Sequence, residues 1–384
     1  MKHLFLLLAA LLTLPTHAQR GFEDINVEQI KKLQMAQVAI TSLYVDTVDQ
    51  NKLVEDAING ILGKLDPHSS YTNANQTKKR NEPLSGNFEG IGVSFNMVKD
   101  TLLVLQVISK GPSEKAGILS GDRIIAVNGT KIAGVKMDRD SIMTRLRGPK
   151  GTIANLVIVR RGANEVLHFK VTRDKIPVNT VDAAYMITPT AGYIHLDSFG
   201  ATSGKEIDDK IKLLQEAGMK DLILDLEFNG GGYLNAAQEV ASQFLPKGSM
   251  IVYTEGRVMP RQELVAEGFG RMQKEGRVVI HVDEFTASAA EIVSGAVQDH
   301  DRGVIIGRRT FGKGLVQRPI DLPDGSMIRL TVSHYYTPSG RCIQKPYVKG
   351  EKEEYNNDLD KRYTHGELTC LDSIHLDSTK VYKT

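Results

Sequence analysis

The segment that most constrains the fold comprises residues 278–317, which alternate between strand and helix patterns. Residues 278–282 are apolar and β-branched, which is typical of a buried strand. Ser288 follows a short turn and begins an S-A-A-E stretch, the S-x-x-E pattern that opens a helix, here as far as about Gln298. A second apolar run, residues 303–307, follows that helix. The segment therefore predicts two neighbouring strands of an α/β sheet joined by a helix.

Lys313 follows the second of these strands and is flanked by glycines. Because Ser288 and Lys313 each follow one of two adjacent strands, we expect them to lie close together. A serine hydroxyl beside a buried, neutral lysine amine is a known activated nucleophile. An unperturbed lysine has a pKa of about 10.4, so desolvation must lower that pKa before the amine can act as a base near neutral pH. The segment around Lys313 is apolar and free of acidic residues, and Gln317 is placed to orient the amine without charging it.

These residues have two other interpretations. Taken alone, a serine in an S-x-x-E pattern is more often only a helix cap. Residues 307–313 also match the G-x-x-x-x-G-K pattern of a phosphate-binding loop. That loop requires Ser or Thr after the lysine and then a helix, whereas Gly314 and a strand-like L-V-Q-R-P-I-D-L run follow here. A nucleotide site is therefore disfavoured.

Two longer motifs, T-A-S-A-A-E-I-V-S-G-A-V-Q-D around Ser288 and T-F-G-K-G-L-V-Q around Lys313, point to one family. They resemble the carboxy-terminal processing (tail-specific) proteases, serine peptidases with a Ser/Lys dyad, whose members usually read T/S-A-S-A-S-E. The resemblance implies that Ser288 is the nucleophile, that Lys313 is the general base and that Gln317 positions the lysine. This chemistry requires no cofactor and no metal, and none is expected.

A glycine-rich turn, E-F-N-G-G-G, joins the apolar run at residues 222–226 to a helix pattern at residues 234–244. Such a turn presents backbone N–H groups to an anion, although it is also common as a plain tight turn. Members of the family usually read D-L-R-x-N-P-G-G here, and this chain departs from them at Glu227 and Gly230. The resemblance implies that the N–H groups of Gly231 and Ala289 form the oxyanion hole.

Residues 87–173 form a β-rich module that contains two motifs, G-P-S-E-K-A-G-I and G-D-R-I-I-A-V-N-G. Both are similar to the signature of a PDZ domain. In such a domain the stretch Gly90-Ile91-Gly92-Val93 would be the loop that binds the terminal carboxylate of a peptide, which then adds as a strand to the sheet edge. Arg147, in L-R-G-P, either links domains or lies on the surface.

The N-terminal part contains an apolar run at residues 4–14 that ends in T-H-A, which predicts a signal peptide over residues 1–18. No second apolar run of about 20 residues follows, so no membrane span is expected. The protein is therefore predicted to be exported to the periplasm or cell envelope. Residues 22–85 read as helical, and the second helix face there ends in a turn, L-D-P-H-S-S-Y at residues 65–71, which also resembles the family. His68 in this stretch is interpreted as a turn residue rather than a base.

The net charge, the two cysteines and one histidine-containing run bear on nucleic-acid binding, disulfide formation and metal binding. A net charge of +2 over 384 residues, with no basic block, gives no indication of nucleic-acid binding. Cys342 and Cys370 either form a disulfide, which export would permit, or remain two thiols. The run Asp299-His300-Asp301 is interpreted as a polar helix end rather than a metal site.

The predicted organisation is an α/β protease core of crotonase-like fold with an inserted PDZ domain and a helical N-terminal segment. The parts are a signal peptide (1–18), a helical domain (19–86), the PDZ domain (87–173), the protease core (174–344) and a charged tail (345–384). The family's usual Gly-Ile-x-Pro-Asp element is absent after Gln344. Either a C-terminal piece is missing or the chain has an inserted tail, and the first is the favoured expectation.

The sequence thus predicts an exported serine endopeptidase that cleaves proteins near their C-termini. Its expected partner is a protein or peptide with a free, apolar C-terminus. The alternative is a non-catalytic PDZ adaptor with a degenerate protease core, which the departures at Glu227 and Gly230 favour and the intact dyad opposes. Whether the chain forms a homo-oligomer stays open at this stage.

Overall fold

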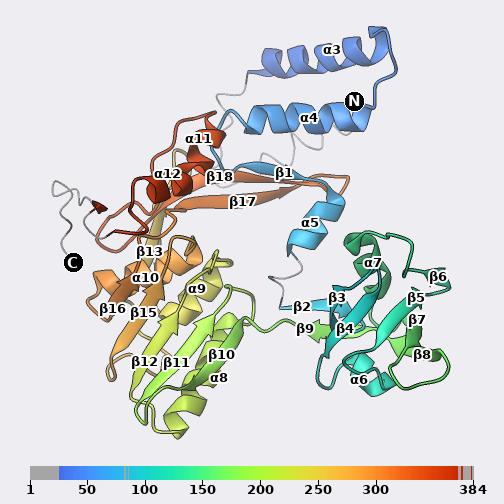
Figure 1. The fold of residues 1–384 in the computed structure, drawn as a ribbon. Helices are drawn as coiled ribbons and strands as arrows, with labels where there is room; N and C mark the ends of the chain where they lie inside the picture. Colours follow the sequence, from blue (N-terminus) through green and yellow to red (C-terminus); the bar gives the residue numbers. More distant parts are fainter. Residues whose placement is uncertain (1–25, 82–83, 85, 371–372, 375–381, 383–384) are drawn as a thin grey trace. The chain divides into compact units, whose positions relative to one another are not determined.

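The computed structural model describes residues 26–81, 84, 86–370, 373–374 and 382. The predicted signal peptide lies outside the described residues. The chain divides into two compact units, one formed by Asn81–Asn179 and the other by Met1–Arg80 together with Thr180–Thr384 (Figure 1). No helix in the described part is both long and apolar enough to cross a membrane.

The larger unit contains a five-stranded sheet whose inner strands are parallel, as predicted for an α/β core. Its order is β10 (Val181–Met186), β11 (Ala191–Leu196), β12 (Asp221–Asp225), β15 (Val278–Val282) and β16 (Val304–Gly307), with β10 antiparallel to β11. The helices of this α/β core are α8 (Ser203–Glu216), α9 (Leu234–Ala241) and α10 (Ala289–Asp299). Side chains of β11 and β15 alternate between buried and half-buried. One face of the sheet therefore belongs to the main core, and the other carries the half-buried residues.

The core itself is apolar and continuous between sheet and helices. Ile194, Leu224 and Ile280 from three neighbouring strands are fully buried, as are Val240 of α9 and Val293 of α10. This burial explains why the sequence of α10 is apolar on nearly all sides: ten of its eleven residues are buried.

A second, antiparallel sheet completes the larger unit. It runs β1 (Ser70–Thr72), β18 (Met327–Tyr336), β13 (Met250–Glu255) and β14 (Gln262–Val265), and β17 (Leu315–Asp321) also pairs with β18. The N-terminal region contains the expected helices, α3 (Val27–Leu43), α4 (Gln50–Leu62) and α5 (Ala74–Asn81). It was not expected to contain β1, which joins this region to the sheet that carries β17. Two short helices, α11 (Lys352–Asn356) and α12 (Asp358–Thr364), lie in the C-terminal segment.

The smaller unit is a twisted antiparallel sheet with two helices and its own core. The order is β3 (Val93–Met97), β4 (Leu102–Val107), β5 (Arg123–Val127), β7 (Ile153–Val159) and β8 (Leu167–Thr172), with β6 (Thr130–Lys131) on β5. The helices are α6 (Pro112–Ala116) and α7 (Arg139–Leu146), and a two-stranded ribbon pairs β2 (Asn87–Gly90) with β9 (Asp174–Pro177). Among the described residues, strand β3 pairs only with β4, so its other edge is open there.

Candidate active site

Ser288 occupies the turn between β15 and α10 and begins the helix. Its backbone has φ 57° and ψ −115°, whereas an ordinary helix N-cap is extended. A non-glycine residue in such a sparsely populated region costs about 1–3 kcal/mol and persists only where the surrounding structure holds it. A comparable strained strand-to-helix turn exposes the nucleophile in many hydrolases. This backbone conformation distinguishes Ser288 from a plain helix cap.

The carboxylate of Glu291 joins the serine turn to the loop that carries the lysine, residues 308–314. Its Oε2 accepts hydrogen bonds from the backbone N–H groups of Ser288 and Lys313, both at 2.8 Å. Its Oε1 accepts from the Thr310 hydroxyl at 2.6 Å and from the Gly312 N–H at 2.7 Å. Burial raises the pKa of Glu291, and these four hydrogen bonds oppose that rise. One side chain therefore fixes both segments that carry the predicted dyad.

Lys313 is half-buried two residues before β17, which starts at the buried Leu315. Burial lowers the pKa of its amine, and the positive charges of Arg80 and Arg329 lower it further. The charge of Glu291 acts in the opposite direction. The net shift favours the neutral amine, which is the form that can accept a proton. The sequence predicted the desolvation but not the two arginines, which lie far away along the chain.

Gln317 is anchored to the turn around His68. Its side-chain Nε2 donates a hydrogen bond to the His68 carbonyl at 2.5 Å. That turn is itself fixed because Asp66 accepts hydrogen bonds from the backbone N–H groups of His68 and Ser69 and from the Thr331 hydroxyl, all at 2.9 Å. Burial and the nearby charge of Lys313 lower the pKa of His68 to about 4, so its imidazole is neutral at pH 7. The structure thus connects the L-D-P-H-S-S-Y segment to the strand after the lysine.

The glycine-rich turn packs directly against Ser288. A Cβ placed on Gly231, whose φ is +90°, would lie 2.7 Å from the Ser288 Cβ and 2.9 Å from the Ala289 nitrogen. Glycine is therefore required here both for its backbone conformation and for the close approach. Within the described residues the Ala289 N–H has no hydrogen-bond acceptor, whereas the Gly231 N–H donates to Asn229 Oδ1 at 2.8 Å. Of the two predicted oxyanion donors in this part of the described structure, the Ala289 N–H is therefore free and the Gly231 N–H is occupied.

Two exposed aromatic rings lie next to these turns. Phe228 in the glycine-rich turn and Phe285, three residues before Ser288, stack with their ring centroids 5.2 Å apart. Phe228 is 71% exposed and has φ 60°, a conformation that is unusual for a bulky residue. Its backbone is held there by a hydrogen bond from its N–H to Asp283 at 3.1 Å. No pattern in the sequence pointed to this apolar surface beside Ser288.

The chain from Gln344 onward holds the loop that carries Lys313, residues 308–314, in place through hydrogen bonds. The Gly314 N–H donates to Gln344 Oε1 at 2.9 Å, and the Lys345 N–H donates to the Gly312 carbonyl at 2.9 Å. Arg362 of α12, only 4% exposed, donates to the Arg309 carbonyl at 2.5 Å. The segment from residue 345 was expected to be a charged tail, and the structure gives part of it a role in the site.

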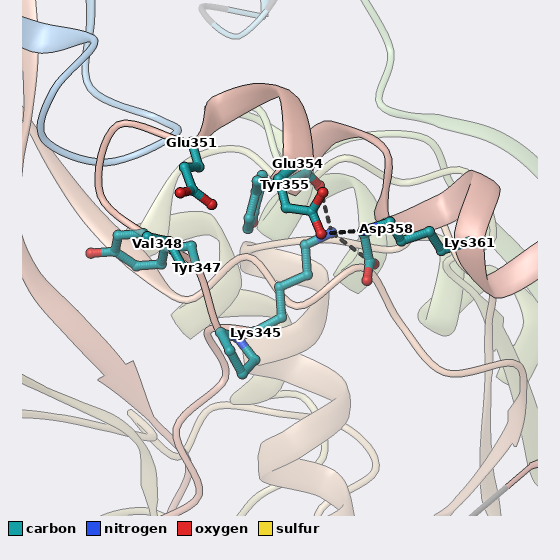
Figure 2. A pocket seen from close by; sticks show the side chains of 9 residues that line it. Lys345, Tyr347, Val348, Glu351, Glu354, Tyr355, Asp358 and Lys361 are labelled. Atoms are coloured by element: carbon teal, nitrogen blue, oxygen red, sulfur yellow. Dashed lines mark hydrogen bonds and ion pairs between the residues drawn. The ribbon is translucent and has the colours of Figure 1, made fainter.

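A cavity of about 340 Å³ lies within this C-terminal segment, around Lys345 (Figure 2). The Lys345 amine bonds to Asp358 at 2.9 Å. It also lies over the rings of Phe311 and Tyr355, 4.3 Å and 4.2 Å from their centroids. The Tyr355 hydroxyl in turn lies 2.8 Å from His68 Nε2. Lys345 is therefore already paired, and we interpret this region as a brace rather than a second reactive site.

In the smaller unit, the predicted carboxylate-binding loop lies at the end of a groove beside the open edge of β3. The groove is lined mainly by apolar side chains of the loop, β3 and α7: Phe88, Ile91, Gly92, Val93, Ser94, Phe95, Arg139, Met143, Leu146 and Arg147. Gly92 has φ +76°, and a Cβ there would lie 2.9 Å from Ile176. In the part of the chain that the structure describes, the N–H groups of Ile91 and Gly92 have no backbone acceptor. This arrangement suits an extended peptide that ends in a carboxylate.

The two cysteines lie in the C-terminal part and are not bonded. Cys342 and Cys370 are both exposed and free. The disulfide that the sequence left open is absent from the structure.

Comparisons with known proteins identify three matched regions. Residues 190–352 match peptidase family S41, residues 90–180 match the PDZ domain, and residues 13–76 match the N-terminal domain of the activating protease CtpB. The S41 match contains Ser288 and Lys313, and the PDZ match contains the loop predicted to bind a carboxylate.

Two curated proteins are similar to the chain over most of its length. A carboxy-terminal-processing protease of Bartonella bacilliformis is 38% identical over 309 residues, which cover 79% of this chain and 70% of the relative. The carboxy-terminal processing protease CtpA of Bacillus subtilis is 36% identical over 345 residues, 88% of this chain and 73% of the relative. A solved photosystem II D1 C-terminal processing protease is 28% identical, covers 85% of this chain and 93% of its own, and has a TM-score of 0.46.

Proposed function

The chain belongs to the carboxy-terminal processing protease family and is a serine-type peptidase with a PDZ domain, and we propose that Ser288 and Lys313 form its catalytic dyad. The observation that carries this proposal is the shared acceptor: Glu291 Oε2 receives the N–H groups of both residues. The strained backbone of Ser288 and the lowered pKa of Lys313 support the same assignment.

In the proposed reaction the Ser288 hydroxyl attacks the scissile carbonyl while the Lys313 amine takes its proton. The tetrahedral intermediate receives a hydrogen bond from the free Ala289 N–H. The lysine ammonium then gives the proton to the leaving amine, and water releases the acyl group by the reverse sequence. Gln317, held by the His68 carbonyl, fixes the strand that follows the lysine.

The second oxyanion donor requires a rearrangement. The Gly231 N–H already donates to Asn229 Oδ1, so it can stabilise an oxyanion only when that hydrogen bond opens. The Asn229 side chain also donates to the Leu196 carbonyl at 2.6 Å, which holds it in place. We therefore interpret this arrangement as a resting site in which the Gly231 N–H is engaged by Asn229.

The proposed substrate is a protein with a free, apolar C-terminus, and the predicted signal peptide indicates an exported enzyme. The groove beside β3 offers such a chain end apolar side chains and two N–H groups, of Ile91 and Gly92, that have no backbone acceptor among the described residues. Phe228 and Phe285 provide an apolar surface next to Ser288 for a residue near the scissile bond. Recognition of the chain end and cleavage upstream of it would thus be separate events on separate units.

The direct test uses an unstructured protein with an apolar C-terminus, incubated with the purified mature chain from about pH 6 to about pH 10. We expect internal cleavage near the C-terminus and covalent labelling of Ser288 by a serine-directed reagent. Binding of the tail without cleavage at every pH would instead support the adaptor alternative.

A further inference from the structure

Beyond the proposed dyad, a second group of reactive side chains lies on the half-buried face of the parallel sheet. His195, Asp225 and His281 are register partners on the neighbouring strands β11, β12 and β15. Register partners in a sheet point to the same face. Glu227 follows Asp225 by two positions, at the start of the glycine-rich turn. The fold therefore brings two histidines and two carboxylates together from three separate parts of the sequence.

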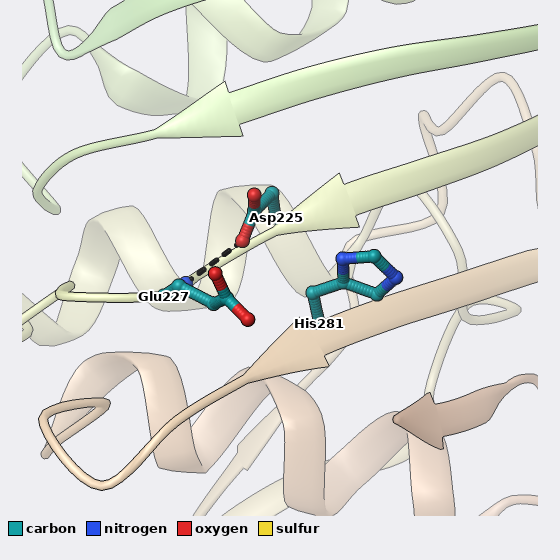
Figure 3. Close-up of side chains that lie close together, drawn as sticks. All are labelled: Asp225, Glu227 and His281. Carbon is teal, nitrogen blue, oxygen red and sulfur yellow. Dashed lines mark hydrogen bonds between the residues drawn. The ribbon is translucent and has the colours of Figure 1, made fainter. Parts of the chain in front are cut away.

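Three of these side chains converge closely enough to share one ion. Single ligand atoms of Asp225, Glu227 and His281 all lie within 4.8 Å of one another (Figure 3). His195 is engaged elsewhere, because its Nδ1 is 2.5 Å from Asp182. Burial opposes the charged form of His195, but the hydrogen bond and charge of Asp182, the Glu227 carbonyl and the charge of Asp225 together raise its pKa. The candidate ligand set is thus one imidazole and two carboxylates.

Asp225 is held in position as metal ligands usually are. It is only 7% exposed, and its Oδ2 accepts a hydrogen bond from the Tyr193 hydroxyl at 2.5 Å. Its Oδ1 accepts the backbone N–H of Glu227 at 2.9 Å. Hydrogen bonds of this kind orient a carboxylate and leave lone pairs on both oxygens for a cation.

The side chains of Glu227 and His281 have no partner of their own. Among the residues that the structure describes, neither side chain forms a hydrogen bond or an ion pair, although both are half-buried. Asp225 likewise has no lysine or arginine partner there. Two carboxylates in one half-buried site repel each other, and His195, the titratable neighbour of Asp225, is already paired with Asp182. Both conditions point to a missing positive charge.

We propose that Asp225, Glu227 and His281 bind a divalent cation of the Zn²⁺ type, with water completing the coordination. The imidazole favours Zn²⁺ over Mg²⁺ and Ca²⁺, which prefer all-oxygen sites. The ion is structural and takes no part in bond cleavage. Because Glu227 begins the turn that carries Gly231, the ion connects β15 to the turn beside the nucleophile.

The test measures metal binding directly, so it stands or falls independently of the proposed protease mechanism. The full mature chain, without a histidine tag and stripped with a chelator, is titrated with Zn²⁺, Mn²⁺, Mg²⁺ and Ca²⁺ by calorimetry. We expect one Zn²⁺ per chain, with weaker Mn²⁺ binding and still weaker Mg²⁺ and Ca²⁺ binding. Glu227→Gln and His281→Asn should each weaken Zn²⁺ binding by at least about tenfold. Glu227→Arg, which puts a guanidinium in the place of the ion, should abolish it.

Asp221→Asn is the matched control, because Asp221 lies at the opposite end of β12 and pairs with Arg277. This variant should bind Zn²⁺ like the unmodified chain. Circular dichroism checks that each variant is folded, and the half-buried Glu227 and His281 are preferred to the buried Asp225 for this reason. Absence of Zn²⁺ binding, or equal binding by Glu227→Gln, His281→Asn and the control, would overturn the proposal.

Discussion

Ser288 and Lys313 donate their backbone N–H groups to the same oxygen, Oε2 of Glu291, each at 2.8 Å. Their amide nitrogens can therefore be no farther apart than the sum of these two hydrogen bonds. This relationship fixes the serine turn against the lysine loop through a single buried side chain. It makes Glu291 a positioning residue for the proposed dyad.

The first prediction concerns that carboxylate. Glu291→Ala leaves the Thr310 hydroxyl and three N–H groups without an acceptor, so the free energy of unfolding should fall by about 2–4 kcal/mol. Glu291→Gln keeps an acceptor but loses the charge, and it should lower kcat/KM by about tenfold or more because the two segments shift. Glu216→Gln, exposed on α8, serves as the control. Unchanged kcat/KM in Glu291→Gln would show that the shared acceptor does not position the dyad.

The second prediction concerns pH. Burial, Arg80 and Arg329 all lower the pKa of Lys313. If the neutral amine is the base, kcat/KM should rise with pH and level off once the amine is deprotonated, below the usual lysine range. Arg80→Gln removes a positive charge that disfavours the ammonium, so the pKa should rise. The acid limb of the profile should then move to higher pH and cleavage at pH 7 should fall.

Arg161→Gln is the control for this shift, because Arg161 is an exposed residue of the smaller unit. It should leave the profile unchanged. An acid limb that stays in place in Arg80→Gln, or moves to lower pH, would contradict lysine as the titrating base.

The third prediction concerns Arg362, through which α12 supports the loop at residues 308–314. Arg362→Ala removes the hydrogen bond to the Arg309 carbonyl and the ion pair to Glu367, both made by a buried guanidinium. The free energy of unfolding should fall by about 2–4 kcal/mol. Hydrogen exchange at residues 309–314 should become faster, and kcat/KM should fall. Lys361→Ala, the exposed neighbour, should change none of these quantities. Equal effects of the two variants would mean that α12 does not support the lysine loop.

Local patterns in the sequence predicted most of the protease core. The apolar run at residues 278–282 corresponds to β15, and the S-A-A-E stretch marks the start of α10. Both segments depend on short-range periodicity and capping, which a sequence carries directly. Strand β1 was missed because only its pairing with β18, far along the chain, makes residues 70–72 a strand.

The features of the site that the sequence did not predict all depend on contacts between residues that lie far apart along the chain. Glu291 was assigned only to the start of a helix, since nothing in its spacing indicates that it also receives Gly312 and Lys313. The group of Asp225, Glu227 and His281 forms through the register of β12 and β15. The C-terminal segment has few apolar residues, so its pattern gave no sign that Arg362 would be buried.

The fourth prediction concerns the PDZ domain. The N–H groups of Ile91 and Gly92, which have no backbone acceptor in the described part of the chain, suit a terminal carboxylate, so an amidated substrate should bind more weakly than one with a free C-terminus. The difference should appear mainly in KM, because the carboxylate is remote from the bond that is cleaved. Deletion of residues 87–173 should remove the difference between the two substrates. Equal cleavage of free and amidated substrates by the intact chain would show that the domain does not recognise C-termini.

The most direct test of the dyad is a comparison of kcat/KM for Ser288→Ala, Lys313→Ala and the double variant on one unstructured substrate with an apolar C-terminus. Lys212→Ala, an exposed lysine of α8, is the control and should retain full activity. Because nucleophile and base act as a unit, each single variant should lose cleavage almost completely while it remains folded, and the double variant should be no worse than either. Substantial turnover by Lys313→Ala, or a double variant whose loss is the product of the two single losses, would contradict a Ser288–Lys313 dyad.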